Sequence, residues 1–448
     1  AEIAKAINAQ NDIEQWKDVE VTSVSFDSRH LDQGSLFVPL QGAQDGHQYV
    51  PSAFTNGAVA SLWASDHEIT DQTHPLLVVN DPLAALQQLG KYYLHKINPI
   101  VVAVTGSNGK TTTKDMIASI LSTQFNVTKT YANFNNEIGV PVTLLNMESN
   151  TEAVVVEMGM DRFGQLDFLS KLVNPDIAVI TMIGEAHIEF FGTRDKIADA
   201  KMEIAHGLKE DGTLVFNGDE PLLEERVKDL TQRQMRFGRQ LSNNLYATSV
   251  HDEPRQLSFT VNEWPDEEFT IPMVGEYNIN NALAAMEVGK ILHITPAHMK
   301  QALANVELTE NRAEWVKGKN GEQILSDVYN SNPTAAREVL KTIAETPVDG
   351  RRIAVLGDML ELGDAAPKLH ASLAEEIDHQ KIASVYLVGE QMKNLKDKLI
   401  QEGYPAEDIH HYAAGDLQQL IADLTATLTG EDIVLLKASH GIHLEEVL

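Results

Sequence analysis

Short apolar runs alternate with amphipathic segments through the middle of the chain. The apolar runs, each long enough for one buried strand, fall at 100–105, 126–130, 153–158, 177–183 and 213–217. The amphipathic segments between them carry apolar residues at helical spacing and fall at 111–124, 165–173 and 194–208. This rhythm predicts a mainly parallel sheet covered by helices on both faces. After it, residues 232–275 indicate short antiparallel strands, and Asn280 to Leu292 indicate a helix.

A second rhythm of the same kind starts near Ile324. Its expected strands fall at 323–328, 352–356, 384–388 and 432–436. Its expected helices fall at 334–345, 368–379, 389–401 and 416–427. Strands and helices in this order are typical of a smaller doubly wound, Rossmann-like domain.

The first 97 residues show a weaker pattern of strands and helices. Helical patterns at 3–9 and 83–95 flank expected strands at Val21 to Phe26 and Leu36 to Val38. We therefore predict an α/β protein with three domains. A small N-terminal α/β domain spans 1–97, a central P-loop ATPase domain with a parallel sheet spans 98–310, and a C-terminal Rossmann-like domain spans 311–448. The second boundary is expected between Leu308 and Trp315.

Composition narrows the possible partners. The 448 residues include 65 acidic and 35 basic side chains, which gives a formal net charge of −30. Such a balance argues against nucleic acid or an anionic membrane as the main partner, because both require a basic surface. The absence of cysteine excludes disulfides and thiol catalysis and fits a reducing cytoplasm. No apolar run approaches the roughly 20 residues of a membrane-spanning helix. We expect a cytoplasmic monomer without membrane insertion that binds small molecules.

A glycine-rich run follows the first central strand directly. Its residues are Thr105, Gly106, Ser107, Asn108, Gly109, Lys110, Thr111 and Thr112. Glycines let backbone N–H groups close around an anion, and the helix that follows adds positive potential. Lys110 is expected to reach the outer phosphates of a nucleotide, and the Thr111 hydroxyl to ligate Mg²⁺. A turn without a ligand is the weaker alternative. The usual motif has its first glycine at the position of Val104.

Two further candidates follow central strands. Glu157 ends the run that starts at Ala153, and His187 follows the run 177–183. Because ligands of open α/β sheets sit outside the carboxyl ends of the strands, both side chains are expected near the glycine-rich run. There, Glu157 is expected to hold Mg²⁺ and His187 to contact metal or phosphate. The alternatives are a carboxylate that caps a strand and a structural histidine.

Lys201 lies beside an apolar helical stripe that contains Ile197, Ala200 and Ile204. The residues alone favour a solvated surface lysine at this position. If it were buried, its pKa would fall, and the amine would become a nucleophile. Such an amine reacts with CO₂ to give a carbamate, which is an anion and a metal ligand.

Polar clusters mark three more places. Asn133 to Pro141 contains Asn135 and Asn136, and either a turn or substrate and phosphate contacts would explain its amides. Tyr277 to Ala282 contains Asn278 and Asn281. Asn311-Arg312 precedes a stretch that runs from Asp327 to Pro333. The last two places fit helix capping and turns, or a grip on adenine and ribose.

Taken together, these motifs closely resemble the Mur ligases, which are ATP-dependent amide-forming enzymes of bacterial cell-wall synthesis. The resemblance spans essentially the whole chain. It rests on the run from Thr105 to Thr112, Asn135 to Pro141, Glu157, Ala186 to Glu189 and Ala200 to Ile204. Further motifs at 26–29, 34–38, 42–47, 327–333 and 357–363 are similar to one branch of the family. That branch joins D-alanyl-D-alanine to a UDP-N-acetylmuramoyl tripeptide.

The resemblance implies roles for individual residues. Lys110 and Thr111 match the phosphate-loop lysine and the Mg²⁺-ligating threonine, and Glu157 and His187 match metal ligands. Lys201 matches a lysine that is carbamylated in many members and supports a second Mg²⁺. The implied nucleotide contacts are Asn278, Asn281, Arg312 and Asp327. The implied UDP-sugar region contains Asp27, Ser28, Arg29, Asp45, Gly46 and His47. Arginine is common in the family where this chain has His440, so no substrate contact is assigned there.

The implied reaction consumes ATP in the presence of Mg²⁺. The terminal carboxylate of UDP-N-acetylmuramoyl tripeptide becomes an acyl phosphate, and the amine of D-Ala-D-Ala attacks it through a tetrahedral intermediate. Two enzymes are alternatives, namely a sibling ligase that adds one amino acid and a folate polyglutamylating ligase. A nucleotide-regulated binding protein without ligase chemistry is the alternative from another class.

Overall fold

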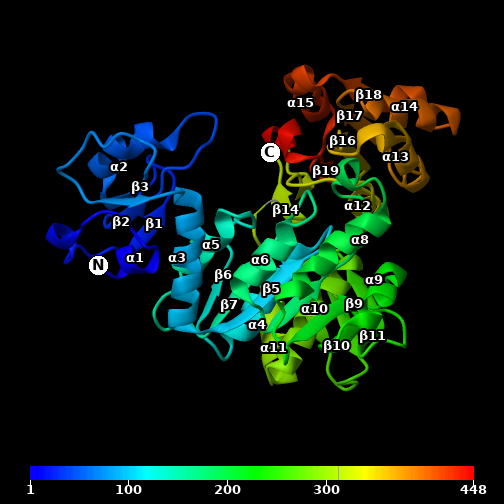
Figure 1. Ribbon diagram of the computed structural model, residues 1–448. Coiled ribbons are helices and arrows are strands. Elements are labelled where there is room, and N and C mark those ends of the chain that lie inside the picture. Colours follow the sequence, from blue (N-terminus) through cyan, green and yellow to red (C-terminus); the bar gives the residue numbers. More distant parts are fainter. Residues whose placement is uncertain (311) are drawn as a thin grey trace.

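The chain folds around three β-sheets (Figure 1). The computed structural model describes residues 1–310 and 312–448, so Asn311 lies outside the described residues. The expected α/β class with parallel sheets is confirmed. In the part of the chain that the model describes, no helix combines the length and the apolar character needed to cross a membrane.

The N-terminal sheet has four parallel strands in the order β1-β2-β3-β4. They are β1 (Ser23–Ser25), β2 (Ser35–Phe37), β3 (Ala58–Ala64) and β4 (Leu76–Val79). Its helices are α1 (Glu2–Ala6), α2 (Val50–Asn56) and α3 (Pro82–Ile97). β3, β4 and α2 were not predicted. Three of the seven residues of β3 are alanines, which have little preference for strands.

The central sheet has nine strands in the order β13-β12-β11-β10-β9-β8-β5-β7-β6. They are β5 (Ile100–Thr105), β6 (Val127–Lys129), β7 (Ala153–Glu157), β8 (Ile177–Ile180), β9 (Thr213–Asn217), β10 (Arg233–Gly238), β11 (Leu245–Glu253), β12 (Gln256–Val261) and β13 (Phe269–Ile271). The prediction that 232–275 is antiparallel is wrong for β10, which pairs in parallel with both β9 and β11. Antiparallel pairing begins only between β11 and β12.

Helices cover both faces of the central sheet. They are α4 (Lys110–Ser122), α5 (Gly139–Leu145), α6 (Gln165–Val173), α7 (Ile188–Phe191), α8 (Arg194–Met202), α9 (Pro221–Arg226), α10 (Tyr277–Ile291) and α11 (Pro296–Ala304). Alternate residues of β5 enter different cores: Val102 packs with α4 and α10, whereas Val101 packs with α6 and α8. Burial on both faces explains why β5 is an unbroken apolar run. The expected helix at 194–208 ends at Met202 and continues as a 3₁₀ turn.

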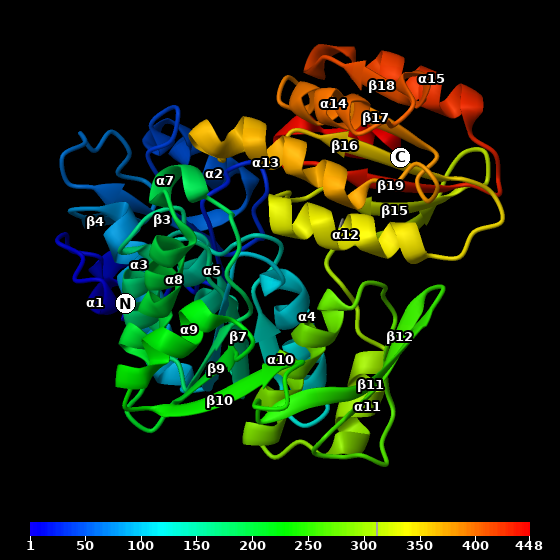
Figure 2. The same ribbon diagram turned by 90° about the vertical axis from the view of Figure 1, so that its right-hand side faces the viewer.

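The C-terminal sheet has six strands in the order β14-β15-β19-β16-β17-β18. They are β14 (Glu314–Lys317), β15 (Gln323–Asp327), β16 (Arg352–Gly357), β17 (Ser384–Val388), β18 (Ile409–Tyr412) and β19 (Ile433–Lys437). Its helices are α12 (Pro333–Glu345), α13 (Ala366–Ser372), α14 (Met392–Gln401) and α15 (Leu417–Thr427). Only the edge strand β14 runs antiparallel to its neighbour. Figure 2 shows α12 on the side of this sheet that faces the central sheet.

One carboxylate lies inside the central core. Glu287 on α10 is fully buried, and neither of its oxygens has a hydrogen-bond partner among the described residues. Burial raises the pKa of Glu287 to about 7, with Lys290 opposing the shift. The folded protein therefore holds this proton to a higher pH than the unfolded chain does.

We expect Glu287→Gln to raise the thermal unfolding midpoint at pH 8 but to change it little at pH 4. The carboxyl stabilises the fold fully below its unfolded pKa of 4.5, and that stability falls as pH rises through about 7. Over this pH range, the free energy of unfolding falls by about 3 kcal/mol in total. Unfolding midpoints between pH 4 and 8 measure it, with the exposed Glu210→Gln as the control. An equal effect of Glu287→Gln at both ends of the range would contradict a buried ionisation.

Candidate active site

The glycine-rich run forms a tight turn between β5 and α4. Val104 lies in β5 and is fully buried, so the turn starts only at Gly106. Gly106 has φ +150°, and a Cβ there would overlap the Thr181 hydroxyl. Gly109 has φ +79°, and a Cβ there would overlap the Asn281 side-chain amide. Both glycines are therefore required by the backbone and by close neighbours.

The turn brings together the residues expected to handle phosphate. Lys110 Nζ donates to Gly106 O at 2.8 Å, so the ammonium folds back over the loop. Thr111 Oγ1 donates to Glu157 Oε2 at 2.9 Å, and Asn135 Nδ2 donates to Glu157 Oε1 at 3.0 Å. Burial lowers the pKa of Lys110, while the carboxylate of Glu157 opposes the shift. The ends of β5 and β7 thus carry one connected polar site.

Lys201 is buried, and the expectation of a solvated surface lysine is wrong. Its side chain is only 2% exposed. Burial lowers its pKa well below the ordinary value, the charge of Lys110 adds to the shift, and Glu157 opposes it. The structure gives Lys201 Nζ no hydrogen-bond or ion-pair partner within residues 1–310 and 312–448. The sequence shows a lysine next to an apolar stripe, but only the packed fold shows that both are covered.

His187 follows β8 in the left-handed conformation, at φ +63°, immediately before α7. Its Nδ1 pairs with Glu361 of the C-terminal domain, and the Glu189 N–H donates to Glu361 O at 3.1 Å. Burial lowers the pKa of His187, and Glu361 opposes the shift. The sequence analysis quoted Glu361 only as part of a motif and gave it no role in the site.

The donor set at this site fits Mg²⁺. Hydroxyl and carboxylate oxygens, here Thr111 Oγ1 and Glu157 Oε2, are the ligands that Mg²⁺ prefers. His187 and Lys201 contribute nitrogen at present, and a carbamate on Lys201 would add the oxygen ligands that the buried amine lacks. Ser107 Oγ is buried without a hydrogen-bond partner among the described residues, as suits a group that faces a bound phosphate.

A cavity of ≈ 350 Å³ lies between the central and C-terminal sheets. It brings together the predicted nucleotide contacts from both domains: Asn108, Gly109, Thr112, Asn278, Asn281, Arg312 and Asp327. Asn278 and Asn281 are tied to one another, since Asn281 Nδ2 donates to Asn278 Oδ1 at 3.0 Å. Asn280 and Arg312 also line this cavity. The buried atoms Asn280 Oδ1 and Arg312 Nε have no hydrogen-bond partner among the described residues. The cavity therefore offers unused polar groups to a ligand.

A second cavity of ≈ 770 Å³ opens on the other side of the glycine-rich turn. It includes the predicted residues Ser107, Lys110, Thr111, Asn135, Asn136, Glu157 and His187. Asn136 also serves the turn, because its Oδ1 accepts from Gly139 N at 2.9 Å. The turn expected for the Asn-rich segment is therefore confirmed, and its contact with substrate or phosphate stays a prediction. Gln87, Asp161, Arg162 and Phe163 also line this cavity, and they were not predicted because no motif in the sequence marks them.

Amide side chains join the glycine-rich turn to the C-terminal domain. Asn108 Nδ2 donates to Asn332 Oδ1 at 3.1 Å, and Asn332 Nδ2 donates to Asn108 Oδ1 at 2.5 Å. Glu185 accepts from the backbone N–H of Thr334 at 3.2 Å and from its hydroxyl. Asn332 also caps α12 through a bond from Ala335 N. These contacts hold the two domains together directly over the site.

The C-terminal wall of the site carries two cationic side chains, Arg312 and Lys437, and an exposed histidine, His440. Arg312 lies over the Tyr329 ring, with its guanidinium carbon 4.0 Å from the ring centre. Lys437 is buried and pairs with Asp327 at 2.8 Å. Burial lowers the pKa of Lys437, and Asp327 opposes the shift. His440 is exposed and stacks on Tyr329 with ring centres 6.0 Å apart.

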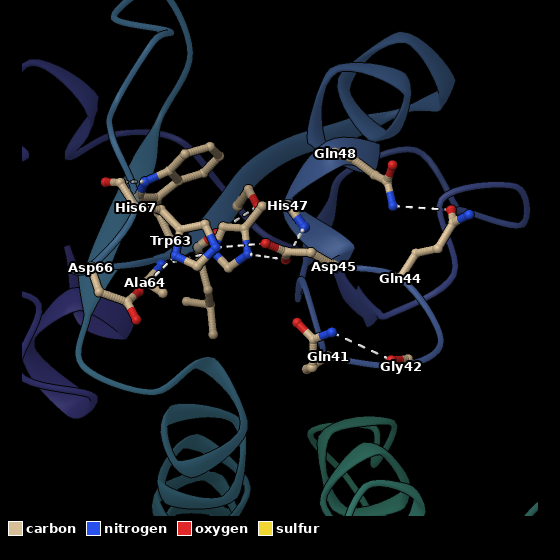
Figure 3. A network of polar contacts seen from close by, with 12 residues as sticks. Gln41, Gly42, Gln44, Asp45, His47, Gln48, Trp63, Ala64, Asp66 and His67 are labelled. Carbon is tan, nitrogen blue, oxygen red and sulfur yellow. Dashed lines mark hydrogen bonds and ion pairs between the residues drawn. The ribbon is translucent and has the colours of Figure 1, made fainter.

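The six residues of the expected UDP-sugar region lie in the N-terminal domain. Among the described residues, neither cavity at the glycine-rich turn includes any of them. Arg29 is turned back onto Asp27 by a two-point contact, with Nη2 2.8 Å from Oδ2, and Ser28 is buried. Asp45, Gly46 and His47 form a compact turn (Figure 3). Gly46 permits this turn because a Cβ there would lie 2.6 Å from the Leu40 backbone.

Comparisons with known proteins agree with this geometry. Residues 20–94 match the Mur ligase family catalytic domain, 104–289 the Mur ligase middle domain, and 311–440 the Mur ligase glutamate ligase domain. A UDP-N-acetylmuramoyl-tripeptide–D-alanyl-D-alanine ligase from Bacillus subtilis is 39% identical over 97% of this chain and 94% of its own.

Two solved structures have the same architecture. A crystal structure of MurF from Acinetobacter baumannii has a TM-score of 0.88 at 28% identity and covers 100% of this chain and 96% of its own. The MurF ligase from Thermotoga maritima in complex with ADP has a TM-score of 0.82 at 28% identity, with coverages of 96% and 97%. The glycine-rich turn, the buried lysine and the full-length similarity agree: the chain belongs to the Mur ligase family.

Proposed function

We propose that this protein is an ATP-dependent ligase that joins D-alanyl-D-alanine to UDP-N-acetylmuramoyl tripeptide. The products are UDP-N-acetylmuramoyl pentapeptide, ADP and phosphate, so the enzyme makes a peptidoglycan precursor. One observation carries the proposal. The two cavities meet at Asn108 and Gly109, so a nucleotide on one side of the turn has its outer phosphate next to the other side. The relative from Bacillus subtilis bears the name of this activity.

The smaller cavity is proposed as the nucleotide site. The backbone of 106–112 would hold the phosphates, and Lys110 would bridge the outer two. Asn278 and Asn281 would face adenine, whereas Arg312 and Asp327 would hold the phosphates and ribose from the C-terminal side. Support comes from the lining of the cavity and from its unpartnered polar atoms. The ADP complex of the Thermotoga maritima relative supports the same choice of nucleotide.

Thr111, Glu157, His187 and carbamylated Lys201 are the residues that would hold Mg²⁺. Bound there, the metal would neutralise charge on the phosphates and on the reacting carboxylate. The protein's part is to keep the donors fixed. Asn135 orients Glu157, Glu361 orients His187, and the packed stripe beside Lys201 keeps its amine out of bulk water.

The larger cavity is proposed to receive the end of the tripeptide. Its terminal carboxylate would lie beside Lys110 and accept the γ-phosphoryl group of ATP. The amine of D-Ala-D-Ala would then attack the acyl phosphate, and phosphate would leave. Lys110 and Arg312 would stabilise the negative charge that builds up on the carbonyl oxygen. Holding three reactants in one site also removes much of the entropic barrier.

We propose that each of the three domains has its own substrate-binding role. Residues 1–97 would hold the UDP-sugar through Asp27, Ser28, Arg29, Asp45, Gly46 and His47. Residues 98–310 would bind ATP, and residues 311–448 would close on it and receive the dipeptide. A hinge near the boundary between these two domains would allow closure.

The test is ADP release with each substrate left out in turn. We expect release only when ATP, a UDP-N-acetylmuramoyl tripeptide and D-Ala-D-Ala are all present, with the lysine and the diaminopimelate tripeptides assayed separately. A tripeptide labelled with ¹⁸O in its terminal carboxylate should deliver one ¹⁸O to the released phosphate. That transfer distinguishes an acyl phosphate from simple ATP hydrolysis.

The same assay separates the alternatives. ADP release with a single amino acid, but not with D-Ala-D-Ala, would identify a sibling ligase. Release with a folate and glutamate would identify a polyglutamylating ligase. Nucleotide binding with no release under any combination would leave a binding protein and overturn the proposal.

A further inference from the structure

His67 lies between two carboxylates, just after β3 (Figure 3). Its Nε2 is 2.6 Å from Asp45 Oδ2, and its Nδ1 is 2.6 Å from Asp66 Oδ1. An ionised carboxylate only accepts hydrogen bonds, so both ring nitrogens must carry a hydrogen to make both contacts. With both carboxylates ionised, the positively charged form of His67 is the one that makes both contacts.

Asp45 connects His67 to the turn that contains His47. The second oxygen of Asp45 accepts from the His47 backbone N–H at 3.0 Å and from His47 Nδ1 at 2.7 Å. His47 Nε2 in turn accepts from Ala64 N at 3.0 Å. The chain of contacts runs from Asp66 through His67 and Asp45 to His47 and back to β3. It fixes the conformation of the segment 45–47.

A metal ion is the obvious alternative, because donor atoms of Asp45, His47 and His67 lie within 4.8 Å of one another. Two features of the geometry argue against it. The rings of His47 and His67 are stacked, with centres 3.8 Å apart and planes only 16° from parallel, so their in-plane nitrogen lone pairs do not converge on one point close to both rings. The bond from Ala64 also occupies the Nε2 lone pair of His47, which leaves the hydrogen on Nδ1. The cluster is therefore a hydrogen-bonded clamp.

We propose that His67 is a positioning residue for the sugar nucleotide, and that its imidazolium holds Asp45, Gly46 and His47 in the conformation that receives this substrate. The inference rests on the proposed function, which assigns the UDP-sugar to this segment. Deprotonation of His67 leaves one of its two carboxylate contacts without a donor. The segment then loosens, and affinity for the sugar nucleotide falls.

The surrounding charges agree with this role. Asp45, Asp66 and the stacked His47 ring are the titratable groups that face His67, and the Trp63 indole N–H donates to the His67 carbonyl at 3.2 Å. Hydrogen bonds to Asp45 and then to Asp66 raise the pKa of His67. The clamp is therefore complete below the ordinary pKa of 6.5 and is lost as pH rises through the raised value. The His47 backbone N–H, followed by His67, holds the pKa of Asp45 below its usual range.

The first test is His67→Gln in the full chain. Glutamine keeps one donor for Asp45 but carries no charge. We expect the KM for UDP-N-acetylmuramoyl tripeptide to rise about fivefold, the upper end for an exposed ion pair. The kcat and the KM for ATP should stay within twofold. The matched control is His74→Gln, which removes another histidine–aspartate contact of the same domain, with Asp71.

The second test shifts the pH midpoint of kcat/KM for the sugar nucleotide. In the wild type, kcat/KM for the sugar nucleotide should fall as pH rises through the His67 pKa, and this step should be absent in His67→Gln. Asp66→Asn removes one carboxylate and should shift the midpoint to lower pH. The same shift should appear in the ring resonances of His67 followed by NMR. With only a structural role, the ring resonances of His67 would still shift in Asp66→Asn, but kcat/KM would show no step at that midpoint.

The outcomes separate this inference from the proposed function. If wild-type protein binds the sugar nucleotide and His67→Gln binds it equally well by calorimetry, the positioning role is wrong and the ligase assignment stands. If the wild type does not bind it, the assignment of the substrate fails, and the positioning role fails with it. One equivalent of Zn²⁺ bound by the wild type but not by His67→Gln would replace the clamp with a metal site.

Discussion

Lys201→Ala should reduce ligase turnover by about a hundredfold or more, because loss of even an outer-sphere partner of a catalytic metal costs about 10- to 100-fold, and carbamylated Lys201 is proposed as a direct ligand. Lys201 is buried, and burial holds its pKa well below the ordinary lysine value. The charge of Lys110 lowers this pKa further, whereas Glu157 opposes the shift. A neutral amine in this position would attack CO₂, form a C–N bond, release a proton and become the carbamate proposed above. Alanine leaves that space without an anion.

Chemical rescue distinguishes a carbamate from a packing role. Formate or acetate should restore part of the activity of Lys201→Ala, because a free carboxylate can occupy the vacated volume. Growth with ¹³C-labelled bicarbonate should give the wild type, but not the variant, a carbamate resonance in the ¹³C spectrum. Lys196→Ala on the exposed side of the same helix is the control. Full activity of unrescued Lys201→Ala would rule out the carbamate.

Gly106→Ala should weaken nucleotide binding by at least about a hundredfold, since strain of about 3 kcal/mol corresponds to that factor. Two effects act together at this position. The φ of +150° is unfavourable for alanine, and the new Cβ would overlap the hydroxyl of Thr181. That hydroxyl donates to Asn108 O, so its displacement would also distort the turn.

A glycine outside the site provides the control, and a double variant separates strain from overlap. Gly403 has φ +91°, and a Cβ there would meet nothing within 4 Å, so Gly403→Ala should leave ATP and ADP affinities unchanged. Adding Thr181→Ala to Gly106→Ala should recover part of the lost affinity, because it removes the overlapping oxygen. Calorimetric titration with ADP measures all of these variants. Wild-type affinity in Gly106→Ala would mean that the backbone of the turn does not hold the phosphates.

The sequence pattern was sufficient to predict those parts of the site whose residues are neighbours in the chain. β5, the turn at 106–109 and α4 could be predicted because the apolar run, two glycines and the lysine follow one another within 15 residues. The convergence of Glu157 and Thr111 was predictable for a similar reason. Parallel strands place their carboxyl ends at one edge, whichever residues form the rest of the fold.

Long-range packing accounts for what the sequence did not reveal. Nothing near Lys201 in the chain shows that its amine is covered, because the cover comes from the packing of separate helices and strands. Asn108 and Asn332 are 224 positions apart in the chain but form a hydrogen bond. His67 follows β3 in the chain and contacts Asp45, which precedes β3. The pairing direction of β10 also depends on β9 and β11. It cannot be read from its own six residues.

The paired amides of Asn108 and Asn332 have a thermodynamic consequence. One partner belongs to the turn between the two cavities, and the other begins the helix that the C-terminal domain presents to it. A ligand that orders the turn therefore also favours closure, and linkage requires the converse to hold by the same factor. A substitution that weakens closure far from the nucleotide must lower nucleotide affinity. By the same linkage, bound nucleotide must shift the equilibrium between open and closed arrangements towards the closed one.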